Sequence, residues 1–146
     1  MSEPSIREIQ PGEDAVAYPA IVELRPQVGT LEQFETAIAL QRERGYRMVG
    51  VFEEGVTDAA AVVGFGTSQK LAWGSYLYVE DTSTHPEHQR KGHANRLFEW
   101  VIEEAKRLGV NQMHLDSGVQ RHGAHRLYIR SGMRISSHHF QMDFDS

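Results

Sequence analysis

The sequence of 146 residues contains no cysteine. Disulfides, cysteine metal ligands and cysteine nucleophiles are therefore excluded. Apolar runs of about 20 residues, the length of a membrane span, are also missing. The first ten residues, MSEPSIREIQ, have neither the basic region nor the apolar core of a signal peptide. These absences lead us to expect a cytoplasmic protein that does not bind a membrane.

An excess of positive charge is absent as well. The formal net charge is −5, which argues against nucleic acid as the main partner. The cations are nevertheless concentrated in two short stretches, from His85 to Arg96 and from Arg121 to Arg134. Two local basic patches on an acidic protein favour a small anionic ligand over a polymer.

The histidines raise the question of a metal site, because His85 and His88, and His138 and His139, are close in sequence. No carboxylate–histidine motif with a known metal spacing accompanies either pair. Histidines flanking an anion site explain them more simply. We therefore expect no metal.

The length is typical of a single domain, here residues 1–146. The periodicity of apolar residues and the positions of turn residues predict the elements in chain order. They are a strand at Ser5–Ile9, a helical stretch at Glu13–Leu24, a helix from Thr30 to Arg44, strands at Tyr46–Phe52, Ala60–Gln69 and Ser75–Thr84, a helix at Ala94–Leu108, a strand at Asn111–Ser117, a helix at Gly123–Ser131, and one or two strands within Met133–Phe144. This order predicts an α/β (α+β) fold in which helices cover a mixed sheet.

Three local signals refine this prediction. Thr30-Leu31-Glu32-Gln33 has the form of a capping box at a helix start. Pro19 must either kink the first helical stretch or mark the first turn of a shorter helix. Gly64 and Gly66 lack the third glycine and the following helix of a nucleotide-binding loop, so they indicate a bulged strand.

The segment Gln89-Arg90-Lys91-Gly92-His93-Ala94 lies between a predicted strand and a predicted helix. The first N–H groups of a helix have no intrahelical acceptor, and the helix dipole is positive at this end. Gly92 and Ala94 have little or no side chain, so a ligand can approach the main chain closely. Arg90 and Lys91 add positive charge. The segment therefore predicts a phosphate or pyrophosphate site.

A second motif follows in the predicted last helix, Ala124-His125-Arg126-Leu127-Tyr128-Ile129-Arg130-Ser131-Gly132-Met133. With both motifs in this order, nearly the whole chain resembles the GNAT superfamily of N-acetyltransferases, whose signatures are Gln/Arg-x-x-Gly-x-Gly/Ala and Ala-x-x-Leu/Phe-Tyr-x-x-x-Gly-Phe. Three positions depart from the family pattern. Met133 replaces the final phenylalanine, Arg90 stands where many members have glycine, and Arg121 stands where many have an asparagine that helps position the cofactor.

The resemblance implies a GNAT-like mixed, mostly antiparallel sheet of six to seven strands with about four helices. It also implies acetyl-CoA as co-substrate. The pyrophosphate would be held by main-chain amides, the pantetheine arm would pair with a strand, and two arginines of the last helix region would give further cofactor contacts. The residues are Gln89, Arg90, Lys91, Gly92, His93, Ala94 and Asn95 for the pyrophosphate, Thr82, Ser83 and Thr84 for the pantetheine, and Arg121 and Arg130 for the further contacts.

The resemblance also gives Tyr128 the role of proton donor to the leaving thiolate, although a tyrosine on an amphipathic helix can simply pack in the core. Glu80 is the candidate general base, in a position where some polyamine-acetylating members have a glutamate; its alternative role is to cap the strand end. Asp81 is expected on the opposite face of the strand from Glu80, where it would grip a cationic acceptor.

We expect an enzyme that moves an acetyl group from acetyl-CoA to a primary amine of a small metabolite by direct attack, because no cysteine can carry an acyl intermediate. Aminoalkylphosphonates and polyamines both remain open as acceptors. One rival hypothesis is a non-catalytic acyl-CoA-binding sensor, and the other is a protein lysine or N-terminal acetyltransferase. The resemblance further suggests a homodimer through the final strands.

Overall fold

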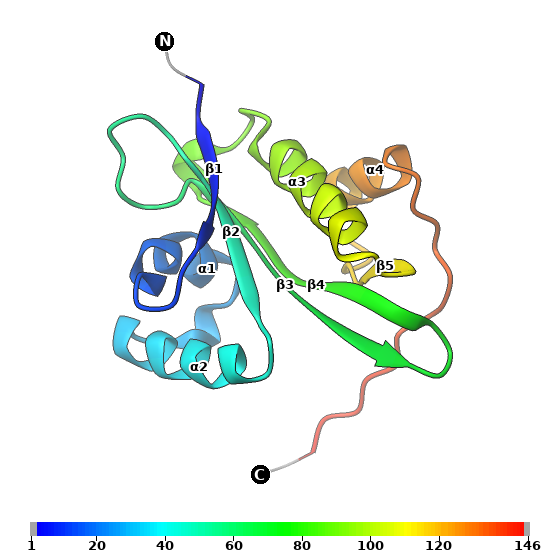
Figure 1. Cartoon of the computed structure of the whole chain (residues 1–146). Helices are drawn as coiled ribbons and strands as arrows, with labels where there is room; N and C mark the ends of the chain where they lie inside the picture. The colour runs from blue at the N-terminus through cyan, green and yellow to red at the C-terminus, as the bar shows by residue number, and fades with distance from the viewer. Residues whose placement is uncertain (1–2, 145–146) are drawn as a thin grey trace. The chain divides into compact units, whose positions relative to one another are not determined.

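The computed structural model describes residues 3–144 and shows two compact units (Figure 1). The first unit extends to Leu115, and the second begins at Asp116. Each unit is described by itself. Within residues 3–144, no helix is both long enough and apolar enough to cross a membrane.

The first unit is built on one five-stranded sheet in the order β1-β2-β3-β4-β5. The first three pairings are antiparallel, whereas β4 and β5 are parallel. The strands are β1 (Ser5–Ile9), β2 (Arg47–Phe52), β3 (Ala61–Lys70), β4 (Gly74–Thr84) and β5 (Gln112–Leu115). The predicted mixed α/β fold is confirmed.

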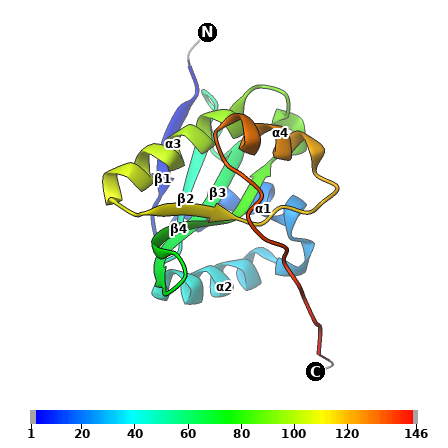
Figure 2. The same cartoon turned by 90° about the vertical axis from the view of Figure 1, so that its right-hand side faces the viewer.

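Both faces of this sheet are covered, and this explains the continuous apolar runs of β2 and the first half of β3. On one face, β2 residues such as Met48 pack with Ile21 of α1 (Tyr18–Leu24) and Phe34 of α2 (Leu31–Glu43). On the other face, Val49 and its neighbours pack with Leu97 of α3 (His93–Leu108). Figure 2 shows the sheet between α2 and α3. A strand buried on both faces cannot show a period-2 pattern.

The local signals at the helix ends correspond to observed contacts. Thr30 Oγ1 accepts a hydrogen bond from the Gln33 N–H at 3.2 Å, and Gln33 Oε1 accepts one from the Thr30 N–H at 2.8 Å, so the predicted capping box is confirmed. Pro19 lies in the first turn of α1. The expected long helical stretch is therefore a short 3₁₀ helix, Asp14–Ala17, followed by the shorter helix α1. Proline fits a first helical turn because the N–H that it lacks has no partner there.

The second unit contains α4 (His122–Arg130), the fourth α-helix of the described residues. The last turn of α4 is closed by the Met133 N–H, which donates to the carbonyl oxygen of Tyr128 at 3.0 Å. Ser131 Oγ donates to the Leu127 carbonyl at 2.8 Å.

The strands expected within Met133–Phe144 are not formed in the described residues, so the sheet has five strands rather than six or seven. Phe140, Met142 and Phe144 alternate with polar residues, as in a half-buried strand, but all three side chains are exposed. Alternation describes how a strand would present its side chains, whereas a strand forms only against a neighbour that supplies hydrogen bonds. The expected homodimer depended on these strands and stays a prediction.

Candidate functional site

Strand β4 contains a bulge at Glu80. In the register with β3, Asp81 lies opposite Gly64, whereas Val79 lies opposite Phe65, so Glu80 is an extra residue without a counterpart. A bulge of this kind disrupts the ladder locally and redirects the strand. The sequence predicted a bulge in the strand of Gly64 and Gly66. The register shift does lie at Gly64 and Phe65, but the extra residue belongs to the partner strand β4.

The bulge exchanges the faces of β4. Before it, Leu77 and Val79 are buried in the apolar cluster that includes α3. After it, Asp81 contacts Arg25 at the end of α1, and Ser83 Oγ donates to the Ala20 carbonyl of α1 at 2.6 Å. Uninterrupted alternation would have put all four odd-numbered residues on one face. The sequence analysis expected Asp81 on the face opposite Glu80 because side chains alternate along a regular strand. The bulge at Glu80 interrupts this alternation.

The segment of β4 beyond the bulge has one open edge. On one side, Thr82, Ser83 and Thr84 pair with β3 residues Val63, Val62 and Ala61. On the other side, β5 pairs only with the earlier part of the strand, from Tyr76 to Val79. Among the described strands, none pairs with Thr82–Thr84 along this second edge. Such an edge can accept an extended, amide-containing molecule as an added strand.

Glu80 is exposed at the bulge. Partial burial of its carboxyl, followed by the nearby charge of Asp81, raises the pKa of Glu80 above its usual value. Both causes disfavour the ionised form. A carboxylate with a raised pKa is a stronger proton acceptor than an ordinary glutamate.

Asp81 is held on both carboxylate oxygens. Its Oδ1 lies 3.0 Å from Arg25 Nε, and its Oδ2 accepts a hydrogen bond from the Tyr46 hydroxyl at 2.8 Å. Burial, and then the charge of Asp81, raise the pKa of Tyr46 well above its usual value, so the phenol stays protonated as a donor. Gly64 makes room for this contact, because a Cβ there would overlap the Tyr46 hydroxyl.

The loop between β4 and α3 has two residues in the left-handed region. Arg90 has a φ of 64°, and Gly92, the N-cap residue of α3, has a φ of 79°. Gly92 provides no side-chain cap. The N–H groups of His93, Ala94 and Asn95 therefore begin the helix without an intrahelical acceptor, as at the N-terminus of any helix. The arrangement suits a phosphate group approaching the main chain.

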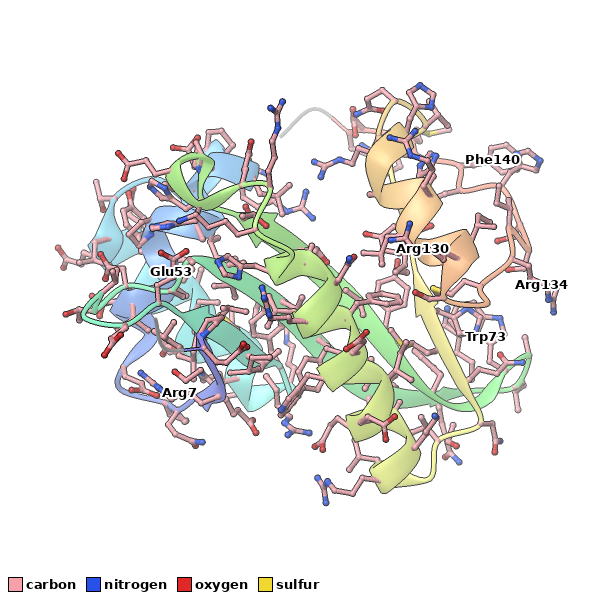
Figure 3. The ribbon with its side chains drawn as sticks, turned by 90° about the horizontal axis from the view of Figure 1, so that it is seen from above. Arg7, Glu53, Trp73, Arg130, Arg134 and Phe140 are labelled. Atoms are coloured by element: carbon pink, nitrogen blue, oxygen red, sulfur yellow. The ribbon has the colours of Figure 1, made fainter. Side chains whose placement is uncertain are left out.

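Glu53 anchors this loop through its carboxylate. The residue lies just after β2 and is labelled in Figure 3. Its Oε2 lies 2.8 Å from His93 Nε2, 3.2 Å from Lys91 Nζ and 3.0 Å from His88 Nδ1. The hydrogen bond to His93, and further the contacts of Lys91 and His88, lower the pKa of Glu53 to about 2. Sequence reasoning missed this residue, since Glu53 is 35 to 40 positions from its partners.

The loop side chains thus differ in how they are placed. His93 is buried against Glu53, so it offers a ligand only its main chain. Lys91 is exposed but points to Glu53, and the Arg96 guanidinium donates to the Lys91 carbonyl oxygen at 2.6 Å. The other loop candidates Gln89, Arg90, Gly92 and Asn95 are exposed, and Ala94 is half-buried.

The remaining candidates, Tyr128, Arg121 and Arg130, lie together in the second unit. Arg121 is the N-cap residue of α4, and Arg130 is the last residue of that helix. Both arginines are exposed, whereas Tyr128 is half-buried. A hydrogen-bond contact of 2.9 Å between His125 Nε2 and the Gly118 carbonyl ties the first half of α4 to the preceding turn.

His85, Glu87 and His88 offer metal-ligand atoms that all lie within 4.8 Å of one another. Two of their nitrogens already have close protein neighbours. His85 Nδ1 accepts a hydrogen bond from the Glu87 N–H at 3.2 Å, and His88 Nδ1 lies 3.0 Å from Glu53 Oε2 at an angle that makes no hydrogen bond. The contacts of His85 and His88 therefore tie these two side chains to the loop and to Glu53.

Comparison with known proteins identifies the family and the fold of the chain. The family model described as acetyltransferase (GNAT) family matches residues 14–133. The chain is 27% identical over 128 residues to a Bacillus subtilis (strain 168) protein named uncharacterized N-acetyltransferase YhdJ, covering 87% of this chain and 89% of that protein.

Solved structures with the same fold include an acetyltransferase from Trypanosoma brucei, with a TM-score of 0.81 and 17% identity, covering 97% of this chain and all of that one. Another is AAC(6')-Iy in complex with a CoA-containing bisubstrate analogue, with a TM-score of 0.78 and 13% identity, covering 99% of this chain and all of that one. The chain belongs to the GNAT family of acetyltransferases.

Proposed function

We propose that the chain is an N-acetyltransferase that transfers the acetyl group of acetyl-CoA directly to the primary amine of a small molecule. The observation that carries the proposal is the bulge of β4, which puts Glu80 beside the open strand edge of Thr82–Thr84. The pantetheine arm would pair with this edge, and the pyrophosphate would lie against the main chain from Gln89 to Asn95. Cofactor contacts by Arg121 and Arg130 stay a prediction from the family resemblance.

The reaction requires that a proton be removed from the amine. An alkyl amine with a pKa near 10.4 is mostly protonated at pH 7, and the neutral form costs about 4.6 kcal/mol. Glu80 would take this proton, directly or through water, because its raised pKa makes it a better base. A strand amide near Thr82 would donate to the acetyl oxygen as negative charge develops there.

The leaving group also requires a proton. A thiolate with a pKa near 8.5 leaves more readily when a donor is close. Tyr128 would donate its phenolic proton to the sulfur of CoA. With no cysteine in the chain, an acyl-cysteine intermediate is excluded, so the amine attacks the thioester directly.

The proposal is tested by CoA thiol release from acetyl-CoA with a panel of amines, namely amino acids, aminophosphonates, polyamines and aminoglycosides, together with peptides. Thiol release that requires an amine supports the enzyme, and release with peptides alone would identify a protein acetyltransferase instead. Acetyl-CoA binding without thiol release from any amine would contradict the proposal and favour a sensor.

Tyr128→Phe tests the proposed proton donor, because it removes the hydroxyl and keeps the ring. We expect kcat to fall by about 100-fold, the lower end for loss of one proton-transfer group, with little change in the affinity for acetyl-CoA. Tyr18→Phe, at a tyrosine whose hydroxyl bonds the Gly29 carbonyl in the first unit, is the control. An unchanged kcat in Tyr128→Phe would show that another group or water protonates the thiolate.

A further inference from the structure

Arg25 contacts Asp81 and the main chain of Glu80, the proposed base. It is the C-cap residue of α1. Its Nε donates to Asp81 Oδ1 at 3.0 Å, and one Nη2 hydrogen is donated to the carbonyl oxygen of Glu80 at 3.1 Å. The bulge produces this contact, because it turns Asp81 toward α1. The sequence did not indicate the pairing, since 55 and 56 positions separate Arg25 from these two residues.

Asp81 is not available to a cationic acceptor in this arrangement. One carboxylate oxygen contacts the Arg25 guanidinium, and the other accepts the Tyr46 hydroxyl. The positive charge of Arg25 therefore offsets the negative charge of Asp81. A polyamine would have to displace a preformed charged hydrogen bond before it gained one.

Arg25, in contrast, still has donors to offer. A guanidinium carries five N–H donors in a planar fork, and the contacts to Asp81 and Glu80 use two of them. Among the described residues, none accepts from Nη1 of Arg25, and 40% of the side chain is exposed. A guanidinium that is fixed on one edge and open on the other is suited to a carboxylate or a phosphate-type oxyanion.

We propose that the acceptor is a small amine that also carries a carboxylate or a phosphonate or phosphate group, and that Arg25 binds this oxyanion while Glu80 takes the amine proton. This inference rests on the proposed function and names the substrate class of the same site. It replaces the expectation of a cationic acceptor held by Asp81.

The step balances as follows. The ammonium form of the acceptor gives one proton to Glu80, which returns it to solvent. The neutral nitrogen then forms a C–N bond with the acetyl carbon, the C–S bond breaks, and the nitrogen loses its second proton through Glu80. The CoA thiolate receives a proton, so the products are the N-acetylated oxyanion and CoA. No oxidant or other reactant is needed.

The experiment compares acceptors that differ only in the oxyanion. The pairs are alanine with alaninamide and 2-aminoethylphosphonate with ethanolamine, and putrescine is the cationic acceptor. We expect the oxyanion member of at least one pair to be preferred by tenfold or more in kcat/KM, roughly the effect of one charged hydrogen bond. The two pairs distinguish a carboxylate from a phosphonate. Equal rates within both pairs, or a preference for putrescine, would overturn the proposal.

Arg25→Gln should remove the preference, because kcat/KM for the oxyanion acceptor should fall at least tenfold more than kcat/KM for the uncharged member, mainly through a higher KM. Because Asp81 then loses its cation, activity with putrescine should rise. Arg44→Gln, at an exposed arginine at the end of α2, should change none of these ratios. An equal loss with every acceptor would mean that Arg25 only supports the strand, and the proposal would be wrong.

Two further measurements keep the proposal falsifiable. If Arg25→Gln does not fold, the double variant with Asp81→Asn removes both charges together, and the same loss of oxyanion preference is expected. If no amine releases thiol from acetyl-CoA, the proposed function fails. In that case, calorimetry tests whether Arg25 binds an oxyanion, by measuring the binding of N-acetylalanine and N-acetyl-2-aminoethylphosphonate in the presence of CoA. Binding that Arg25→Gln abolishes supports the oxyanion site, and absence of binding to the wild-type protein contradicts it.

Discussion

Glu53 and Glu80 are two glutamates of the same sheet region whose environments have opposite effects. Glu53 lies just after β2, and His93 and Lys91 lower its pKa to about 2. Glu80 lies at the bulge of β4, where partial burial and the charge of Asp81 raise its pKa. The first carboxylate therefore stays ionised and holds a loop, whereas the second is suited to exchanging a proton. Two residues of one type differ in role because different partners surround them.

The same contrast applies to the segments that carry these residues. The loop from Gln89 to Gly92 is shaped by contacts between its own side chains and Glu53, which leaves main-chain amides for a ligand. The segment from Glu80 to Thr84 is shaped by a register shift, which leaves a strand edge and a carboxylate. The proposed acid–base site and the proposed anion site thus both lie within the thirteen residues from Glu80 to Gly92.

The largest effect is expected from Glu80→Gln, which removes the proposed base and keeps its shape. We expect kcat to fall by about 10²-fold or more, the usual contribution of a general base. In the wild-type protein, activity should fall as the pH drops through the raised pKa of Glu80, because the protonated carboxyl accepts no proton. This acid limb should be missing from the residual activity of the variant.

Measurement of kcat against pH for both proteins tests this expectation, with Glu35→Gln on the exposed side of α2 as the control. The stability should change in the opposite sense to the activity. A raised pKa in the folded state means that ionisation of Glu80 opposes folding at neutral pH, so Glu80→Gln should unfold at a slightly higher temperature. A variant with wild-type activity would remove Glu80 from the mechanism.

Glu53→Gln tests the other half of the comparison. It weakens the hydrogen bonds to His93 and Lys91, so we expect a loss of about 1–3 kcal/mol in the free energy of unfolding at pH 7. The lowered pKa means that the ionised carboxylate stabilises the fold above its ordinary value of 4.5, and that this contribution disappears as the pH falls toward about 2. The difference between variant and wild type should therefore shrink between pH 6 and pH 3.

Urea unfolding across this range measures the difference, and the neighbouring exposed residue supplies the control, Glu54→Gln. His88, Lys91 and His93 are the groups that face Glu53. A difference that stays constant from pH 6 to pH 3 would show that Glu53 contributes through packing rather than charge.

The smallest effect is expected from Arg90→Gly in the anion-binding loop. Arg90 is held at a φ of 64°, where a non-glycine residue costs about 1–2 kcal/mol. Glycine relieves this strain but also makes the unfolded chain more flexible, so we expect a net gain of about 1 kcal/mol or less. Thermal unfolding should show a rise of about 2–4 °C or less. Arg90→Ala keeps the strain and should show no gain; an equal rise in both variants would mean that charge, not backbone conformation, matters at this position.

The sequence was informative where the signal was local. Three such signals depend on residues within one or two helical turns of each other. They are the Thr30 capping box, Pro19 in a first helical turn, and the apolar face of α3 with Leu97, Val101 and Ala105. The loop of Gln89 to Ala94 was also recognisable, because glycine spacing at a helix start is a local pattern. The failure at Met133–Phe144 has the same origin: alternation was present, but the described residues supply no neighbouring strand.

What the sequence determined by itself was the order of helices and strands as far as α4 and the position of the loop that we propose to bind the pyrophosphate, since both follow from short-range periodicity and turn chemistry. Only the tertiary structure brought Glu53 to His93, and Arg25 and Tyr46 to Asp81, from 35 to 56 positions away. The bulge at Glu80 decided which face these side chains share. Register between strands is set by how both sheet faces pack, and no single segment contains that information.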